Sequence, residues 1–296
     1  MGALLSAGPT AAARFVEQAA RSRIDLDRIW CVAGPDGRYR MAVLAVPARG
    51  RTVMVMATRV RDAAQAATVS RTIDAACEGC RDAGDIAQSL LEPERKHDAA
   101  AFEGAGFRAL ATLEYQERHL PRVGPPEATS LPAGWTIEPA ASDEALGSDD
   151  PASIDATSRA ALERILESTY RDTLDCPGLA GMRRVSDVLE GHFGQGRRRR
   201  IWLVARRDAT VGAVCLLNGS PDGAQAELAY FGVAPEARGS GIAAALLSAG
   251  IRACAAARAG SVQLAVDARN EPAKRLYARL GFRTVSSRLA LVRPLR

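Results

Sequence analysis

The segment 227–247 constrains the fold of this chain more than any other part of the sequence. Its first residues, 227–233, are mostly apolar and predict a buried strand. A basic turn with Arg238, Gly239 and Gly241 follows, and a run rich in alanine and leucine then predicts a helix. Because glycine has no Cβ, its backbone can turn sharply and approach a ligand closely. The sequence therefore predicts a strand, a tight turn and a helix in direct succession, an arrangement typical of α/β proteins.

The same turn is expected to bind an anion. The first N–H groups of a helix lack partners within the helix, and the helix dipole is positive at that end. Arg238 adds a positive charge there, so the turn suits a di-anion such as pyrophosphate. It matches neither a Walker loop nor the three-glycine dinucleotide fingerprint. An ordinary structural turn remains an open alternative for this segment taken alone.

Two further patterns follow the turn in order. Asn270 begins the pattern Asn-x-x-Ala-x-x-Leu-Tyr, which ends at Tyr277, and Gly281 and Phe282 come directly before a final apolar stretch. Together with the turn at 238–243, this order closely resembles the GNAT family of N-acetyltransferases. The resemblance covers about residues 135–293.

The resemblance implies an α/β (α+β) fold and acetyl-CoA as co-substrate, with transfer of the acetyl group to an amine by direct attack on the thioester. It implies a splayed strand ending at Val233, with the pantetheine arm alongside it and the Val233 N–H facing the thioester carbonyl. The residues expected to contact the co-substrate are Phe231, Gly232, Val233, Arg238, Gly239, Ser240, Gly241, Ile242, Ala243 and Asn270.

Two residues are expected to carry the proton transfers. Glu227 is the only carboxylate in its apolar strand and corresponds to the base of similar family members, and burial would raise its pKa toward a useful value. Its alternative is an exposed carboxylate, or one held by an arginine. Tyr277 is the expected acid for the leaving sulfur. Its alternative is a core tyrosine packed against Phe282.

The resemblance places the acceptor site near residues 170–179. Asp172 and Asp175 are expected to hold a cationic amine, either of a small molecule or of a peptide. A plain Pro-Gly turn with Asp175 capping a helix is the structural alternative. Cys176 suggests a covalent acyl-enzyme only weakly, because no base is apparent beside it.

Composition excludes several classes of function. The chain is 47% hydrophobic and 25% charged, as in globular proteins, and no apolar run reaches the length of a membrane helix. No secretory leader is recognisable, so a cytoplasmic protein is expected. The lone CxxC pair, Cys77 and Cys80, and three scattered histidines predict no metal site.

The chain carries a net charge of +5, and its most basic run is 197–200. This run is expected to be a solvated turn. Because aromatic residues are not interleaved with it, nucleic-acid binding is not expected. The sequence leaves a monomer and a homodimer equally open.

The proline-rich segment 119–134 is expected to link two similar halves. Residues 135–296 form the expected catalytic domain, and 1–118 a degenerate copy of it, so that each domain has a mixed, mostly antiparallel twisted sheet flanked by helices. The copy has no glycine at 57–64, where Asp62 would repel a pyrophosphate, and the stretch 98–103 lacks the tyrosine. An unrelated α+β domain is the alternative for the N-terminal half. For the whole chain, the alternative function is a non-catalytic acyl-CoA-binding sensor or scaffold.

Overall fold

The computed structural model of the protein describes residues 9–21, 24–121, 126–148, 150–193, 199–220 and 222–296. The chain divides into two compact units. Unit 1 is Met1–Thr112 with Gly181–Arg183 and Ser287–Arg296, and unit 2 is Leu113–Ala180 with Arg184–Ser286. The strands β5 (Arg108–His119) and β11 (Arg283–Pro294) are each divided between the units. The units therefore do not end at the expected boundaries 118 and 135, because each takes strand residues from the other half of the chain.

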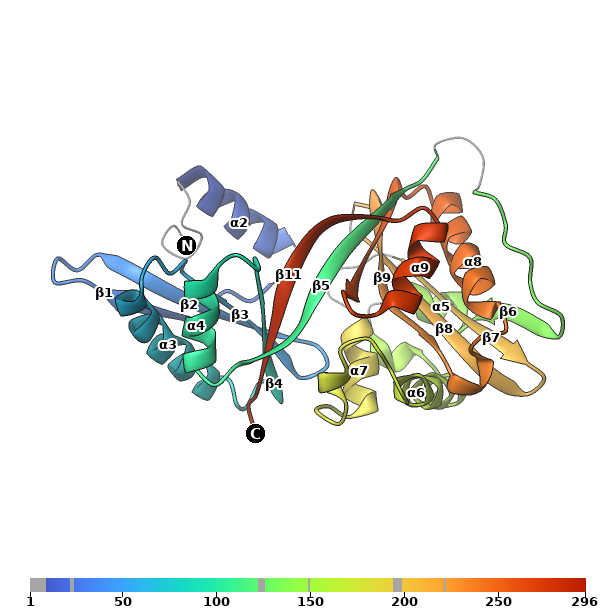
Figure 1. Cartoon of the computed structure of the whole chain (residues 1–296), viewed down its shortest axis with the longest axis horizontal. Helices are drawn as coiled ribbons and strands as arrows, with labels where there is room; N and C mark the ends of the chain where they lie inside the picture. The colour runs from blue at the N-terminus through green and yellow to red at the C-terminus, as the bar shows by residue number, and fades with distance from the viewer. Residues whose placement is uncertain (1–8, 22–23, 122–125, 149, 194–198, 221) are drawn as a thin grey trace. The chain divides into compact units, whose positions relative to one another are not determined.

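Unit 1 is a mixed sheet with helices on its two faces (Figure 1). Its strands follow the order β1-β2-β3-β4-β11, in which β3 and β4 are parallel and the other neighbours antiparallel. Alternate residues of β2 face opposite sides, so that Val43 packs with α3 and α4 while Leu44 packs with α2. The elements are α2 (Pro9–Arg21), β1 (Ile29–Ala33), β2 (Tyr39–Ala48), β3 (Thr52–Ala57), α3 (Ala63–Glu78), β4 (Ile86–Leu91) and α4 (Lys96–Gly104).

Unit 2 repeats this plan. Its strands follow the order β6-β7-β8-β9-β10-β5, and β9 and β10 are the parallel pair. Cys215 and Leu217 of β8 pack toward α8 and α9, while Val214 and Leu216 pack toward α5, α6 and α7. The elements are β6 (Trp135–Pro139), α5 (Asp143–Gly147), η1 (Pro151–Ser153), α6 (Ala156–Tyr170), η2 (Pro177–Leu179), α7 (Val185–His192), β7 (Arg200–Arg207), β8 (Thr210–Gly219), β9 (Gln225–Val233), η3 (Pro235–Ala237), α8 (Ile242–Ala256), β10 (Ser261–Asp267) and α9 (Glu271–Arg279).

Two side-chain arrangements recur in the units. In unit 2, Tyr277 of α9 meets Phe282 edge to face with 5.8 Å between ring centroids, and in unit 1 Phe102 of α4 meets Phe107 in the same way at 5.1 Å. The carbonyls of the residues that directly follow these helices are also bound alike. Arg118 of β5 donates to the Leu280 carbonyl. Arg293 of β11 donates to the Ala105 carbonyl.

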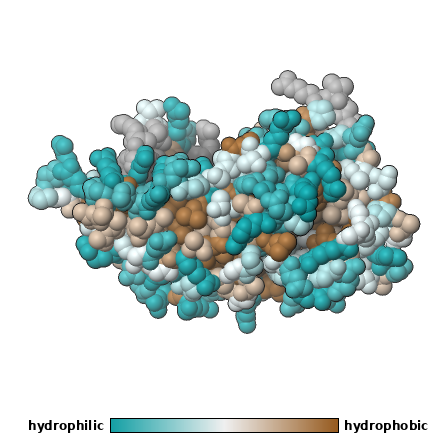
Figure 2. All heavy atoms as spheres, viewed as in Figure 1, coloured by the Kyte–Doolittle hydropathy of each residue, from teal (hydrophilic) through white to brown (hydrophobic). Residues whose placement is uncertain are grey.

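Each unit thus has the predicted fold class, a mixed and mostly antiparallel sheet flanked by helices. The visible face in Figure 2 is mainly hydrophilic and is interrupted by smaller hydrophobic areas. None of the helices described above is long and apolar enough to cross a membrane.

Candidate functional site

The site begins where β9 and β10 diverge. The two strands pair only at 225–227 and 261–263 within the described part of the chain. Farther along β9, Leu216 of β8 pairs with Tyr230 and Leu217 with Leu228, which leaves Ala229 as an extra residue in a β-bulge. A bulge bends its strand and increases the local twist. The edge of β9 that faced β10 is consequently open from residue 228 onward, as the expected splayed strand requires.

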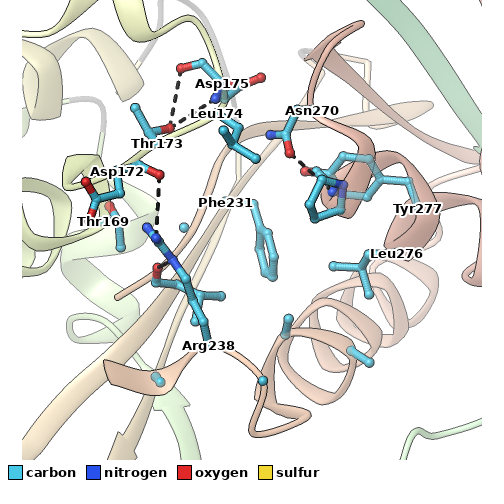
Figure 3. A pocket seen from close by; sticks show the side chains of 18 of the residues that line it. Thr169, Asp172, Thr173, Leu174, Asp175, Phe231, Arg238, Asn270, Leu276 and Tyr277 are labelled. Atoms are coloured by element: carbon cyan, nitrogen blue, oxygen red, sulfur yellow. Dashed lines mark hydrogen bonds between the residues drawn. The ribbon is translucent and has the colours of Figure 1, made fainter. Parts of the chain in front are cut away.

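A cavity of about 580 Å³ lies at this opening, entirely within unit 2. Four segments line it: the end of α6 with the loop that follows, the end of β9, the turn into α8, and one face of α9. Figure 3 shows Phe231 in the middle of this space, with Arg238 on one side and Leu276 on the other. The cavity therefore brings together segments that are more than 100 residues apart in the sequence.

The turn into α8 has the backbone that the sequence predicts. Gly239 and Gly241 have φ values of 77° and 84°, a region that side-chain-bearing residues rarely adopt. Gly241, the N-cap residue of α8, offers no side-chain cap, and the Ser240 hydroxyl accepts from the Ile242 N–H at 3.4 Å. The first-turn residues Ala243 and Ala244 line the cavity. The N–H groups of Ala243 and Ala244, in the first turn of this helix, are thus placed to meet an anion. Ser240 and Ile242 do not line the cavity: the Ser240 hydroxyl donates to the Ala237 carbonyl, and Ile242 is in the core.

Arg238 binds main-chain carbonyls beside the turn. Its guanidinium donates to the Arg171 carbonyl at 2.7 Å, to the Asp172 carbonyl at 3.5 Å and to the Val233 carbonyl at 3.3 Å. Arg171 in turn forms an ion pair with Glu236 at 2.6 Å. Arg238 therefore brings a positive charge to the cavity and also fastens the loop after α6 to the end of β9.

Asn270 and Tyr277 bring α9 to the cavity. The Asn270 side chain accepts from the Ala273 N–H at 3.3 Å and so caps the helix, while Asn270 itself lines the cavity. Tyr277 lines the cavity too, although only 6% of it is exposed. Burial, with the nearby Asp175 charge, raises the pKa of Tyr277, so its hydroxyl stays protonated at neutral pH. Tyr277 packs on Phe282 as a core residue and also lines the cavity, so its packing is compatible with a role as an acid there.

The loop after α6 is bound to the end of β10 by a reciprocal pair of hydrogen bonds. The Asp267 N–H donates to Asp175 Oδ1 at 2.8 Å, and the Cys176 N–H donates to Asp267 Oδ2 at 3.3 Å. The Asp267 side chain is fully buried, which favours its neutral form, but hydrogen bonds from Arg269 outweigh this and lower the pKa of Asp267. Asp172 and Asp175 both line the cavity.

Cys176 is not among the residues that line the cavity. Burial, followed by the charges of Asp175 and Asp267, raises the pKa of its thiol to about 12. Since the thiolate is the nucleophilic form of cysteine, this environment opposes the acyl-enzyme route.

The expectation that Glu227 is buried is wrong. Glu227 is exposed and lies near the beginning of β9, opposite Gln263 of β10 and Asn218 of β8. It does not line the cavity, which begins at Tyr230 farther along the same strand. The open edge of β9 starts only after Glu227, so Glu227 lies where β9 is still paired with β10.

Sequence reasoning missed Thr169 and Tyr230 as cavity residues. Their side-chain oxygens are 2.7 Å apart, and the Thr169 hydroxyl also lies 2.8 Å from the Leu166 carbonyl. The signal that could have found them is Gly232, because a glycine inside a strand often marks a close approach of another segment. A Cβ at Gly232 would lie 2.7 Å from the Thr169 Cβ.

Gly232→Ala is therefore expected to destabilise unit 2. The added methyl group would force α6 away from β9, which should lower the free energy of unfolding by about 1–3 kcal/mol. Urea denaturation measures this, and Gly147→Ala is the matched control because a Cβ there meets nothing within 4 Å. Equal midpoints for the two variants would contradict the close packing of α6 on β9.

The basic run 197–200 is only partly described, since Arg197 and Arg198 lie outside the described residues. Arg200 is not solvated as expected: it is 3% exposed and donates to the carbonyls of Phe193 and Ser148. Its guanidinium also lies 4.8 Å from the centre of the Phe193 ring. Arg200 thus contributes to packing beneath α7.

No group of three or more His, Cys, Asp or Glu side chains among the described residues is arranged to hold a metal ion. The six cysteines are free thiols, and of these only Cys31 is exposed.

The fold and the cavity define a two-unit α/β protein with a glycine turn at a helix N-terminus beside a splayed parallel strand pair. Residues 164–282 match the model of the acetyltransferase (GNAT) family, so unit 2 contains a GNAT acetyltransferase domain. Members of this family transfer an acyl group from acyl-CoA to an amine. No curated protein matches the chain significantly.

Solved structures share the fold over nearly the whole chain. The GCN5-related N-acetyltransferase from Sphaerobacter thermophilus is similar with a TM-score of 0.60 and 19% identity, over 96% of this chain and 86% of that one. A tandem GNAT protein from the clavulanic acid biosynthesis pathway is similar with a TM-score of 0.57 and 16% identity, over 95% of this chain and 88% of that one. The GCN5-related N-acetyltransferase from Kribbella flavida is similar with a TM-score of 0.53 and 18% identity, over 97% of this chain and 96% of that one. These likenesses establish the shared fold.

Proposed function

We propose that unit 2 is an acetyl-CoA-dependent N-acetyltransferase that moves the acetyl group to the amine of a small molecule or a peptide. The observation that carries this proposal is that the open edge of β9 and the first turn of α8 border one cavity. A ligand that is both an anion and an extended chain of amides would use both features at once, and coenzyme A has this chemistry.

The residues present suit coenzyme A at each end of the cavity. Gly239 and Gly241 add no side chains to the turn, and the first turn of α8 favours a pyrophosphate. The open edge of β9 up to Val233 offers N–H and C=O groups to the amides of the pantetheine arm, as in strand addition. The volume of about 580 Å³ is within the usual range of ligand pockets.

Tyr277 is the proposed acid that protonates the leaving sulfur. Its hydroxyl remains protonated at neutral pH because burial raises its pKa, and it lines the cavity beside Asn270. Cys176 takes no part in this mechanism, so the acyl group passes directly to the amine.

Tyr277→Phe is expected to lower kcat about 100-fold and to leave acetyl-CoA affinity nearly unchanged. The phenylalanine keeps the packing on Phe282 and removes only the proton donor, as at Phe102 of unit 1. Release of free thiol measures kcat, and calorimetry measures affinity. An unchanged kcat under conditions where chemistry limits the rate would exclude Tyr277 as the acid.

Unit 1 is proposed to be a degenerate copy without a co-substrate. The N-terminus of α3 is already capped, since Asp62 Oδ1 accepts from the Gln65 N–H at 2.8 Å. A carboxylate at this position would repel a pyrophosphate. Phe102 stands in the place that Tyr277 occupies in α9 and lacks the hydroxyl.

The position of Glu227 outside the cavity favours one alternative, an acyl-CoA-binding sensor or scaffold without turnover. One experiment separates the two functions. Calorimetry with acetyl-CoA and longer acyl-CoAs tests binding, and a panel of small amines and peptides monitored for free thiol tests transfer. Binding without thiol release supports the alternative, and absence of binding contradicts both.

A further inference from the structure

We propose that Asp175 is the base that removes the proton from the acceptor amine. This inference rests on the proposed acetyl transfer and assigns the role that Glu227 does not fill. Asp175 and Asp172 are the carboxylates among the described residues that line the cavity. The choice between them follows from their contacts.

The Asp175 carboxyl group is held at the junction of β10 and α9. It accepts from the Asp267 N–H at 2.8 Å and from the side chain of Asn270. It is close enough to Tyr277 and to Tyr230 for its negative charge to raise the pKa of both hydroxyls. Asp175 is therefore the cavity carboxylate whose charge acts on the proposed acid, whereas Asp172 offers its main-chain carbonyl to Arg238.

The loop that carries Asp175 is held at both ends. The carbonyls of Arg171 and Asp172 are bound by Arg238, and the Cys176 N–H is bound by Asp267. Asp172 and Cys176 have φ values of 54° and 46°, so the backbone here adopts a conformation that needs such support. Figure 3 shows this loop at one side of the cavity, with Asp175 next to Leu174 and Asn270 beyond it. A base must be positioned before the substrate arrives, and this loop meets that condition.

The surroundings of Asp175 favour proton uptake. Although much of the residue is exposed, its carboxyl end is desolvated, and this, together with the charge of Asp267, raises the pKa of Asp175 despite the hydrogen bonds that it accepts. The other groups that face this cluster are Arg269, which pairs with Asp267, the neutral thiol of Cys176, and the neutral hydroxyls of Tyr230 and Tyr277. A carboxylate with a raised pKa is a stronger base and remains ionised above that pKa.

The proton balance closes with these two residues. The ammonium form of the acceptor gives one proton to Asp175, and the amine nitrogen then forms the C–N bond to the thioester carbon. The C–S bond breaks, and the sulfur takes the proton of the Tyr277 hydroxyl. The second proton leaves the nitrogen as the amide forms and restores Tyr277. Asp175 releases its proton to solvent.

Asp175→Asn tests the proposal, with Glu227→Gln as the matched carboxylate-to-amide control. An asparagine oxygen still accepts from the Asp267 N–H, so the loop should stay in place while the base is lost. With acetyl-CoA and the best acceptor of the amine panel, Asp175→Asn is expected to lower kcat about 100-fold. Acetyl-CoA affinity is expected to change less than about twofold, and Glu227→Gln is expected to retain wild-type kcat.

Two further measurements separate a base from a merely structural residue. The wild-type rate should fall as the pH falls through the raised pKa of Asp175. This acid limb of the pH–rate profile should be absent in Asp175→Asn. The loss of kcat in Asp175→Asn should also be smaller for an analogue of the acceptor with a less basic amine. Such an amine is already neutral at the assay pH, so it needs no base. A structural role would lower the rate for both amines equally.

Thermal unfolding provides the fold control. An acid whose pKa is raised by folding contributes stability below its unfolded pKa, about 3.9, and loses that contribution as the pH rises through the folded value. Ionised Asp175 therefore opposes folding at neutral pH. Asp175→Asn should have an unchanged or higher Tm there.

The outcomes are distinguishable. If the wild type does not bind acetyl-CoA, the proposed function fails and the base role with it. If the wild type binds and releases thiol but Asp175→Asn keeps its rate and acid limb, only the base role fails. A large loss of rate in Glu227→Gln with none in Asp175→Asn would return the role to Glu227. Binding with no thiol release from any acceptor overturns the base role in favour of a binding module.

Discussion

Gly241→Glu is expected to abolish detectable acetyl-CoA binding and, with it, any acetyl transfer. Gly241 has a φ of 84°, so a residue with a side chain is strained there by about 1–2 kcal/mol. The glutamate also places a negative charge at the N-terminus of α8, where the pyrophosphate is proposed to bind. Together these effects should weaken binding at least 100-fold, which corresponds to about 2.8 kcal/mol.

Gly223→Glu is the matched control for this variant. Gly223 has a φ of 72° and lies in the exposed turn before β9, so the substitution adds similar backbone strain and the same charge away from the cavity. Calorimetry should show wild-type affinity for Gly223→Glu, and both variants should unfold at similar temperatures. Full binding by Gly241→Glu would remove the turn from the proposed site.

Ending the chain at Ser286 is expected to unfold unit 1. The missing residues include Leu291 and Leu295, which are 1% and 3% exposed in the core of that unit. They also supply the strand that pairs with β4 and the Arg293 side chain that binds Asp74, Glu78 and the end of α4. The truncated chain should lose the hydrogen-exchange protection of β2 and β3, although neither strand lies near residue 286 in the sequence.

Point variants in β11 make this test quantitative. Leu291→Ala should lower the free energy of unfolding by about 2–5 kcal/mol, because it leaves a cavity in a packed core. Val285→Ala is the matched control, since Val285 is 59% exposed in the same strand. Retained protection of β2 and β3 after truncation would show that the strand is dispensable for unit 1.

Much of the site could be predicted because its determinants are local. The glycines of the turn, the asparagine that caps α9, and the Tyr277–Phe282 spacing act within a few residues of one another, so they can be recognised along the chain. The proposed loss of the anion site in unit 1 could be recognised for the same reason. Asp62 precedes a helix and caps it, as such a residue commonly does.

The carboxylate proposed as the base could not be assigned in this way. Glu227 and Tyr230 lie on one strand, and only the three-residue pairing with β10 and the bulge at Ala229 decide which of them borders the cavity. Asp175 reaches the site through a hydrogen bond to Asp267, 92 residues away. Burial of Arg200, within a run expected to be solvated, likewise depends on carbonyls of other segments.

The sequence by itself determined the strand, turn and helix of 227–247, the capped helix that follows and the presence of two similar halves, because helix caps, glycine backbones and apolar periodicity are properties of short segments. The tertiary structure alone decided which half each of β5 and β11 completes, and which acidic residues border the cavity. Both β5 and β11 have the apolar pattern of a strand inside a sheet, but this pattern does not determine which strand each pairs with. That choice depends on contacts between residues far apart in the chain, which exist only after the sheets have formed.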